Sequence, residues 1–198
     1  KLDWALPGPV PWTVEEARES AVVHVGESVD DLARFTRQVR AGEIPERPYL
    51  VVGQQSLVDG SRAPAGRHTL YCYSRVPSRP VRGWDAERER FADLIEARIE
   101  QLAPGFRRTI LARQIQAPPD LERENSNLIG GDIGGGSNAW NRQLLFRPLF
   151  PYFRYRTPVV GLYLCSSYAH PGAGVHGMCG YNAAMIAGRD LDRHPNAG

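Results

Sequence analysis

The spacing of apolar residues predicts two amphipathic helices in the first two thirds of the chain. From Val29 to Val39, apolar and small residues recur every three or four positions, which is the spacing of one helix face. Ser28 stands where an N-cap is expected, and Gly42 stands where a helix commonly ends. A clearer apolar stripe begins at Trp84, faces a side rich in Glu and Arg, and ends before Pro104.

Short runs of β-branched and aromatic residues predict strands around these helices. The runs are Ala21–Val25, Tyr49–Val58, His68–Val76 and Arg108–Gln116. Residues 59–67 have turn composition, so the second and third runs are expected to form an antiparallel pair. Residues 1–13 contain prolines and glycines and are expected to be an irregular lead-in.

The second half of the chain has weaker periodicity. Residues 125–148 show neither helical nor strand spacing and include the glycine-rich run Gly130–Ser137; a stretch of this kind inside a domain is usually functional or mobile. Pro118–Glu122 predicts a turn into a short helix. Gly161–Cys165 has the pattern of a short buried strand, and Asn182–Ile186 has helical composition.

Composition and charge narrow the class of protein. The chain has 198 residues, of which 42% are hydrophobic and 23% charged, as in folded globular proteins. Its 24 basic and 22 acidic residues give a net charge of +2, which is too balanced for a dedicated nucleic-acid binder.

No apolar run approaches the ~20 residues of a membrane helix, so we expect no transmembrane segment. Cys72, Cys165 and Cys179 are widely spaced, which predicts no metal site and favours the reducing cytoplasm; peripheral membrane attachment stays open.

The run Gly172–Gly177 matches the pattern GxGxxG literally. It lies between a predicted strand and a predicted helix, where glycines let a backbone approach a pyrophosphate and a helix N-terminus offers free N–H groups. The full pattern also requires a second strand that ends in an acidic residue about 20 positions later, and 21 residues follow Gly177. We therefore do not expect this run to open a complete dinucleotide-binding domain. It predicts either a loop for a polar or anionic ligand or a tight turn without one.

The segments around this run carry a resemblance to a known family. Arg156–Cys165, Ala169–Gly177 and Gly180–Ala184 together resemble the C-terminal flavin-binding segment of the phytoene desaturase-like FAD-dependent oxidoreductases. Gln54–Asp59 and Gly130–Ile133 resemble the middle region of that family. The resemblance implies FAD as the cofactor of a parent enzyme that removes hydride from, or saturates, an apolar small-molecule substrate.

The resemblance also implies a fold and a domain division. We expect an α+β fold in which a mixed or antiparallel sheet with flanking helices forms a substrate-binding domain over residues 1–155. Residues 156–198 would supply the C-terminal strand and helix of an FAD-binding Rossmann-like domain. Because the chain begins at Lys1 without the family's N-terminal GxGxxG segment, we expect a fragment whose N-terminal FAD domain is missing. Such a fragment is not expected to retain FAD, and self-association into a homo-oligomer could cover its exposed apolar face.

The same resemblance implies roles for the glycine-rich loop and the helix that follows it. The residues expected to bind the cofactor are Ser166, Ser167, His170, Gly172, Gly174, Val175, His176, Gly177 and Asn182. The catalytic residues are unknown, but His170 and His176 are candidates because a histidine can carry a proton near neutral pH. The alternative for each is a structural loop histidine.

Aromatic residues and arginines alternate between Trp140 and Arg156. Trp140, Phe146 and Tyr152 are expected to bind the apolar substrate. One alternative is the edge of a core with solvated arginines, and another is stacking on nucleic acid, which the balanced charge disfavours. For the whole chain, the alternative to an oxidoreductase is a non-catalytic fragment or degenerate paralogue that serves as a binding or dimerisation module.

Overall fold

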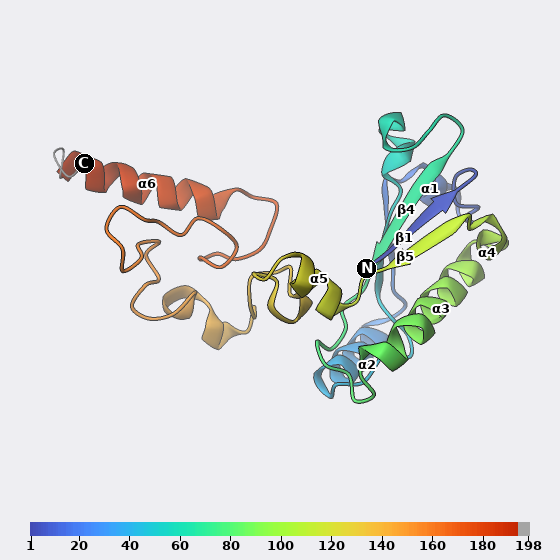
Figure 1. Cartoon of the computed structure of the whole chain (residues 1–198), viewed down its shortest axis with the longest axis horizontal. Helices are drawn as coiled ribbons and strands as arrows, with labels where there is room; N and C mark the ends of the chain where they lie inside the picture. Colours follow the sequence, from blue (N-terminus) through green and yellow to red (C-terminus); the bar gives the residue numbers. More distant parts are fainter. Residues whose placement is uncertain (194–198) are drawn as a thin grey trace. The chain divides into compact units, whose positions relative to one another are not determined.

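The computed structural model describes residues 1–193 and contains two compact units. The first comprises Lys1–Gly131, and the second begins at Asp132; in Figure 1 they run from blue to yellow-green and from yellow-brown to red. The predicted division at residues 155 and 156 concerns two domains of a longer protein and stays a prediction. Residues 194–198 of the predicted second domain lie outside the described residues.

The first unit is built on a five-stranded sheet in the order β2-β3-β4-β1-β5. The strands are β1 (Leu2–Leu6), β2 (Val22–Val25), β3 (Leu50–Gly53), β4 (His68–Tyr73) and β5 (Ala112–Ile115). Every neighbouring pair is antiparallel. The α+β expectation is therefore confirmed for this unit, including the predicted pairing of β3 with β4.

The prediction that residues 1–13 are irregular is wrong for strand β1. Leu2, Trp4 and Leu6 are buried, whereas Asp3 and Ala5 between them are not; this alternation is the signature of a half-buried strand. The strand pairs with β4 on one side and β5 on the other. The prolines that suggested a lead-in follow the strand, beginning at Pro7, and do not interrupt it.

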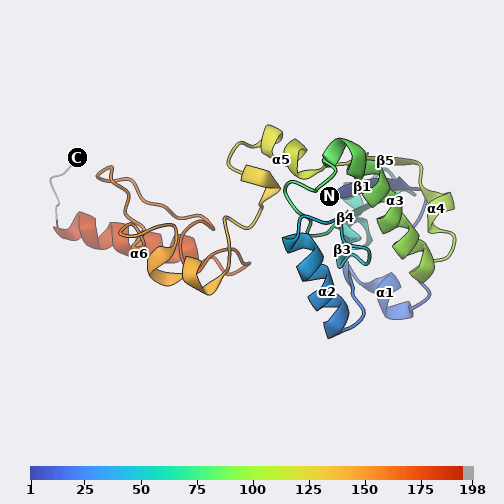
Figure 2. The same cartoon turned by 90° about the horizontal axis from the view of Figure 1, so that it is seen from below.

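Helices flank this sheet and complete its core. They are α1 (Glu15–Glu19), α2 (Val29–Arg40), α3 (Trp84–Leu102), α4 (Phe106–Thr109) and α5 (Pro118–Glu124). As predicted, Ser28 caps α2, and its hydroxyl oxygen accepts the backbone N–H of Asp31 at 3.1 Å. Figures 1 and 2 show α3 lying alongside the sheet, where Ile95 and Ile99 join the buried core.

Three predicted strands are shorter than expected: the run from His68 ends as a strand at Tyr73, and local structure shortens the other two. The run from Tyr49 ends as a strand at Gly53, since the next residue, Gln54, turns inward and is buried. Its side chain accepts the indole N–H of Trp12 at 3.0 Å and donates to the carbonyl oxygens of Ala17 and Ser20. The run from Arg108 begins as a strand only at Ala112, because its first residues belong to α4.

The second unit has little regular structure before its final helix. Three-residue 3₁₀ turns occupy 140–142 and 144–146, and α6 spans Met178–Arg193, which confirms and extends the predicted helix. The strand predicted over Gly161–Cys165 does not form: within the described residues of this unit, the only β-type pairing is an isolated bridge between Arg156 and Tyr163. A strand needs a hydrogen-bonded neighbour, and the described part of this unit offers no sheet. The expected Rossmann-like strand is therefore not confirmed.

The burial pattern of the first unit predicts that two isoleucines contribute very differently to its free energy of unfolding. Ile99 on α3 is fully buried, whereas Ile129 is 73% exposed. Ile99→Ala should lower the free energy of unfolding of this unit by about 2–5 kcal/mol, because it removes buried apolar contacts and leaves a cavity. Ile129→Ala should change it by less than about 0.5 kcal/mol. Urea unfolding followed by tryptophan fluorescence measures both, and equal losses would contradict the assigned core.

Candidate functional site

A buried arginine organises the second unit. Arg147 is 3% exposed, and its guanidinium donates to the carbonyl oxygens of Ser167 (2.6 Å), Gly135 (2.8 Å) and Ser137 (3.1 Å). Within the described residues, no carboxylate lies at ion-pair distance from it. The positive charge is therefore stabilised by backbone carbonyl dipoles, and the guanidinium ties residues 134–137 of the glycine-rich run to the loop that begins at Ser166.

Two glycines permit this close arrangement. Gly172 has a φ of +98°, and a Cβ added there would lie 3.0 Å from the Cζ atom of Arg147. Gly135 has a φ of +69°, and a Cβ there would lie 2.5 Å from the hydroxyl oxygen of Ser167. A side chain at either position would meet both backbone strain and a steric clash. Glycine at positions 135 and 172 thus allows the two segments to pack closely around Arg147.

An aspartate inside the glycine-rich run fixes the turn that follows it. The carboxylate of Asp132 accepts the backbone N–H groups of Gly134 and Gly136, each at 2.7 Å. These bonds hold the run in the turn whose carbonyl groups Arg147 then binds. Charge-assisted hydrogen bonds of this kind are stronger than neutral ones, so the loop is ordered without a strand or a helix.

His176 lies at the start of α6 and contacts its backbone. The Nδ1 atom of its ring accepts the backbone N–H of Met178 at 3.0 Å, which satisfies one of the N–H groups that a helix leaves unpaired at its N-terminus. This contact requires the proton to be on Nε2. It matches the structural alternative for His176, and a role in proton transfer stays a prediction.

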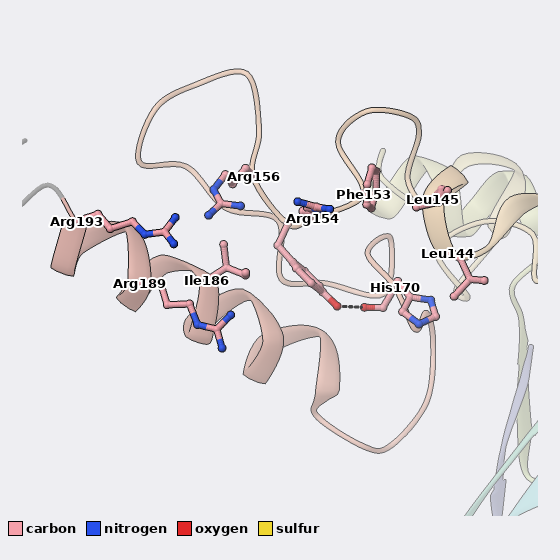
Figure 3. Close-up of a pocket in the computed structure, with 10 residues that line it drawn as sticks. Leu144, Leu145, Phe153, Arg154, Arg156, His170, Ile186, Arg189 and Arg193 are labelled. Carbon is pink, nitrogen blue, oxygen red and sulfur yellow. Dashed lines mark hydrogen bonds between the residues drawn. The ribbon is translucent and has the colours of Figure 1, made fainter.

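His170 takes part in a chain of contacts that joins the loop to α6. The phenol of Tyr155 donates to the carbonyl oxygen of His170 at 2.7 Å and accepts from the side-chain amide of Asn182 at 2.8 Å; Figure 3 shows the first of these bonds. The Nδ1 atom of His170 is buried and has no hydrogen-bond partner among the described residues. Tyr155 thus positions His170 and occupies Asn182, two of the residues predicted to bind the cofactor.

Apart from Asn182, which lies on α6, the predicted cofactor residues belong to one loop with two kinds of environment. Gly172 is buried against Arg147, and Ser167 supplies the carbonyl that Arg147 binds. Gly174, Val175 and Gly177 lie at the surface. Ser166 and His176 are also exposed. The buried half of the loop is therefore held by the protein, whereas the half next to α6 is accessible to a ligand.

The residues predicted to bind substrate are exposed in the second unit. Trp140 is 88% exposed, Phe146 is 53% exposed and Tyr152 is 38% exposed. Their aromatic neighbour Phe153 instead lines a hollow beside His170. Substrate binding by the three exposed residues stays a prediction.

An ion pair attaches the segment after residue 155 to α6. The Arg156 guanidinium donates to both carboxylate oxygens of Asp190, at 2.7 and 2.6 Å, and the Tyr163 phenol donates to the same carboxylate at 3.0 Å. The bonds from Arg156, with the bond from Tyr163 adding to them, lower the pKa of Asp190 to about 2. This carboxylate is therefore ionised at neutral pH.

Arg147 and Tyr155 were not among the residues predicted to form the site. The alternative in which the arginines between Trp140 and Arg156 are solvated is wrong for Arg147, because its side chain is buried. Asp132 at the head of the glycine-rich run was an available sign of a fixed turn, but no local pattern identifies the arginine that binds that turn.

The described residues offer neither a metal-binding cluster nor an activated thiol at Cys72. No cluster of His, Cys, Asp or Glu within residues 1–193 is suited to hold a metal ion. Burial raises the pKa of Cys72 to about 12, so this thiol is not an activated nucleophile. Among the described helices, none combines the length and apolar composition needed to cross a membrane.

The Arg147 contacts predict a local effect of its removal. Arg147→Met should destabilise the second unit by about 3 kcal/mol or more, because the carbonyl groups of Gly135, Ser137 and Ser167 lose their donors. Hydrogen exchange measured by mass spectrometry should show faster exchange over residues 132–137 and 166–177. The exposed Arg142 provides the control, Arg142→Met, which should leave both segments protected. Unchanged exchange in Arg147→Met would contradict the organising role.

Comparison with known proteins identifies relatives over most of the chain. No protein-family model matches. The chain is 40% identical over 155 residues to mouse (Mus musculus) pyridine nucleotide-disulfide oxidoreductase domain-containing protein 2, covering 76% of the chain and 26% of the relative. The rat (Rattus norvegicus) protein of that name is 36% identical over 190 residues, which cover 93% of the chain and 32% of the relative.

A carotenoid enzyme is a more distant relative. The neurosporene-forming phytoene desaturase of Rhodobacter capsulatus is 29% identical over 147 residues, which cover 70% of the chain and 26% of that protein. The chain thus spans about a quarter to a third of the length of these relatives. Together these similarities confirm the resemblance found in the sequence: the chain belongs to the phytoene desaturase-like family of FAD-dependent oxidoreductases.

Proposed function

We propose that the chain is part of an FAD-dependent oxidoreductase of the desaturase or dehydrogenase type, and that the loop before α6 contacts the flavin. The observation that carries the proposal concerns the loop before α6, residues 166–177. This loop is buried against Arg147 at Gly172 and is open to solvent from Gly174 to Gly177. In a family of flavoenzymes, a loop that is rigid at one end and accessible at the other is suited to hold a cofactor.

The accessible half of the loop fits a flavin in space and in polarity. A Cβ added at Gly177 or Gly180 would meet no heavy atom within 4 Å, so a planar ring could approach the backbone there. The N-terminal end of α6 directs backbone N–H groups and the positive end of the helix dipole toward the same region. We infer that the backbone from Gly174 to Gly180 would hold an electron-rich edge of the cofactor.

Arg147 would add a fixed positive charge behind this loop. Its guanidinium contacts Gly172 and the carbonyl group of Ser167, and no described carboxylate neutralises it. When bound, FAD supplies the two-electron chemistry. A preorganised positive charge near the flavin stabilises negative charge on the flavin. Arg147 would make this contribution.

The proposed substrate is an apolar small molecule. The desaturase relatives support this substrate class, and the exposed side chains of Trp140, Phe146 and Tyr152 would supply an apolar contact surface. The same exposed side chains favour the second candidate, a non-catalytic binding or dimerisation module, because exposed apolar patches commonly mark interaction surfaces. Flavin content distinguishes the two candidates. The 198-residue chain alone is still expected not to retain stoichiometric FAD.

Two glycines of α6 provide a matched test in the full-length protein that contains this chain. A Cβ at Gly180 or at Gly188 meets nothing within 4 Å, so both Gly180→Val and Gly188→Val should fold. Gly180 is in the first turn of α6, next to the proposed cofactor loop, and Gly188 is more than two turns away. Gly180→Val should weaken FAD binding at least about tenfold, equivalent to ~1.4 kcal/mol, whereas Gly188→Val should leave it unchanged.

The measurement is the visible flavin absorbance per protein chain, with an FAD titration of the apoprotein. A full-length protein that is colourless and that added FAD cannot reconstitute would overturn the proposed function. Equal FAD affinity in both variants would leave an FAD enzyme but would contradict a flavin at the start of α6.

A further inference from the structure

The second unit contains a hollow that the proposed flavin loop does not account for. Its volume is about 530 Å³, and its walls come from α6, from residues 144–156 and from His170 (Figure 3). Cavities of roughly 300–1,000 Å³ are typical of small-molecule sites. Of the residues predicted to bind the cofactor, only His170 lines this hollow.

Arginine side chains dominate the charge of this hollow. Arg154, Arg156, Arg189 and Arg193 line it, and no acidic residue does. Figure 3 shows Arg189 and Arg193 on α6, with Arg156 across from them. Asp190 binds Arg156 through both carboxylate oxygens and so neutralises one of the four charges.

The other three guanidinium groups have no such carboxylate at ion-pair distance within the described residues. Arg154 instead lies over the Phe153 ring, 5.3 Å from its centroid, a cation–π contact that fixes the guanidinium and leaves its charge intact. Positive groups that gather in one concave surface repel one another and create a positive potential there. An anion that enters the hollow would relieve this repulsion.

The remaining wall of the hollow is apolar. Leu144, Leu145, Phe153 and Ile186 supply it. His170 also lines the hollow. The walls therefore combine an apolar region for a carbon skeleton with a positively charged region for an anion.

We propose that this hollow binds a phosphate monoester whose organic part is apolar, with the phosphate on the arginines and the carbon chain against the leucines and Phe153. A phosphate dianion balances two of the three unneutralised charges, whereas a carboxylate balances only one. Each guanidinium offers a planar fork that binds phosphate oxygens in pairs. The site shares only His170 with the predicted cofactor residues and does not depend on the proposed function.

Isothermal titration of the 198-residue chain with octyl phosphate, in a buffer free of phosphate, tests the site. Octyl phosphate should bind at least about tenfold more tightly than either inorganic phosphate or octanoate, because only octyl phosphate uses both the charged and the apolar walls. Arg189→Ala should weaken octyl phosphate binding about tenfold or more, and Arg154→Ala should do the same. Arg189 and Arg154 are exposed, so both variants should fold, as circular dichroism would verify.

The matched control is Arg142→Ala, which removes an exposed arginine of the same unit that does not line the hollow. Its affinity for octyl phosphate should equal that of the wild type. The proposal is overturned if octyl glucoside binds as tightly as octyl phosphate, if Arg142→Ala weakens binding as much as Arg189→Ala, or if octyl phosphate does not bind. Tighter binding of FMN than of octyl phosphate would also overturn it, because the phosphate of a flavin would then be the better ligand.

Discussion

The buried guanidinium of Arg147 is the contact on which the candidate site depends. The second unit has no sheet within its described residues, so its backbone carbonyl groups must find donors elsewhere. Arg147 supplies them to Gly135, Ser137 and Ser167. Because its charge is met by carbonyl dipoles and not by a carboxylate, the loop before α6 acquires both a fixed position and a positive charge behind it. The rigidity of the buried half of the loop follows from this one side chain.

The first unit is held together by a different balance of forces. Its strands satisfy one another's backbone groups, and its stability comes from apolar burial between the sheet and α3. Trp4 illustrates the combination: its ring packs edge-to-face against Phe106, with centroids 5.6 Å apart, and its indole N–H donates to Glu96 at 2.9 Å. The regular spacing of apolar residues along the sequence predicts the helices and strands of this unit. The second unit depends instead on polar contacts between side chains and loop backbone, which no regular spacing of residues predicts.

That contrast explains what could be predicted from the sequence. Helices α2 and α3 and the pairing of β3 with β4 followed from spacing and turn composition. Strand β1 was missed because the prolines after Leu6 outweighed the alternation of Leu2, Trp4 and Leu6. Gly161–Cys165 looked like a strand, but no described neighbour pairs with it. The glycine-rich loop was visible as a pattern, whereas the contact from Arg147 to Ser167 and the path from Asn182 through Tyr155 to His170 join residues far apart in the chain, and only the folded structure reveals them.

Membership in a flavoenzyme family and a loop ordered by Arg147 together lead to one central claim, that the backbone at the start of α6 contacts the flavin. The most direct test is a crystal structure of the full-length protein with FAD bound. The flavin is predicted to lie in van der Waals contact with the backbone between Gly174 and Gly180, with Arg147 still bound to the carbonyl group of Ser167. A flavin that contacts no residue of that segment would contradict the claim.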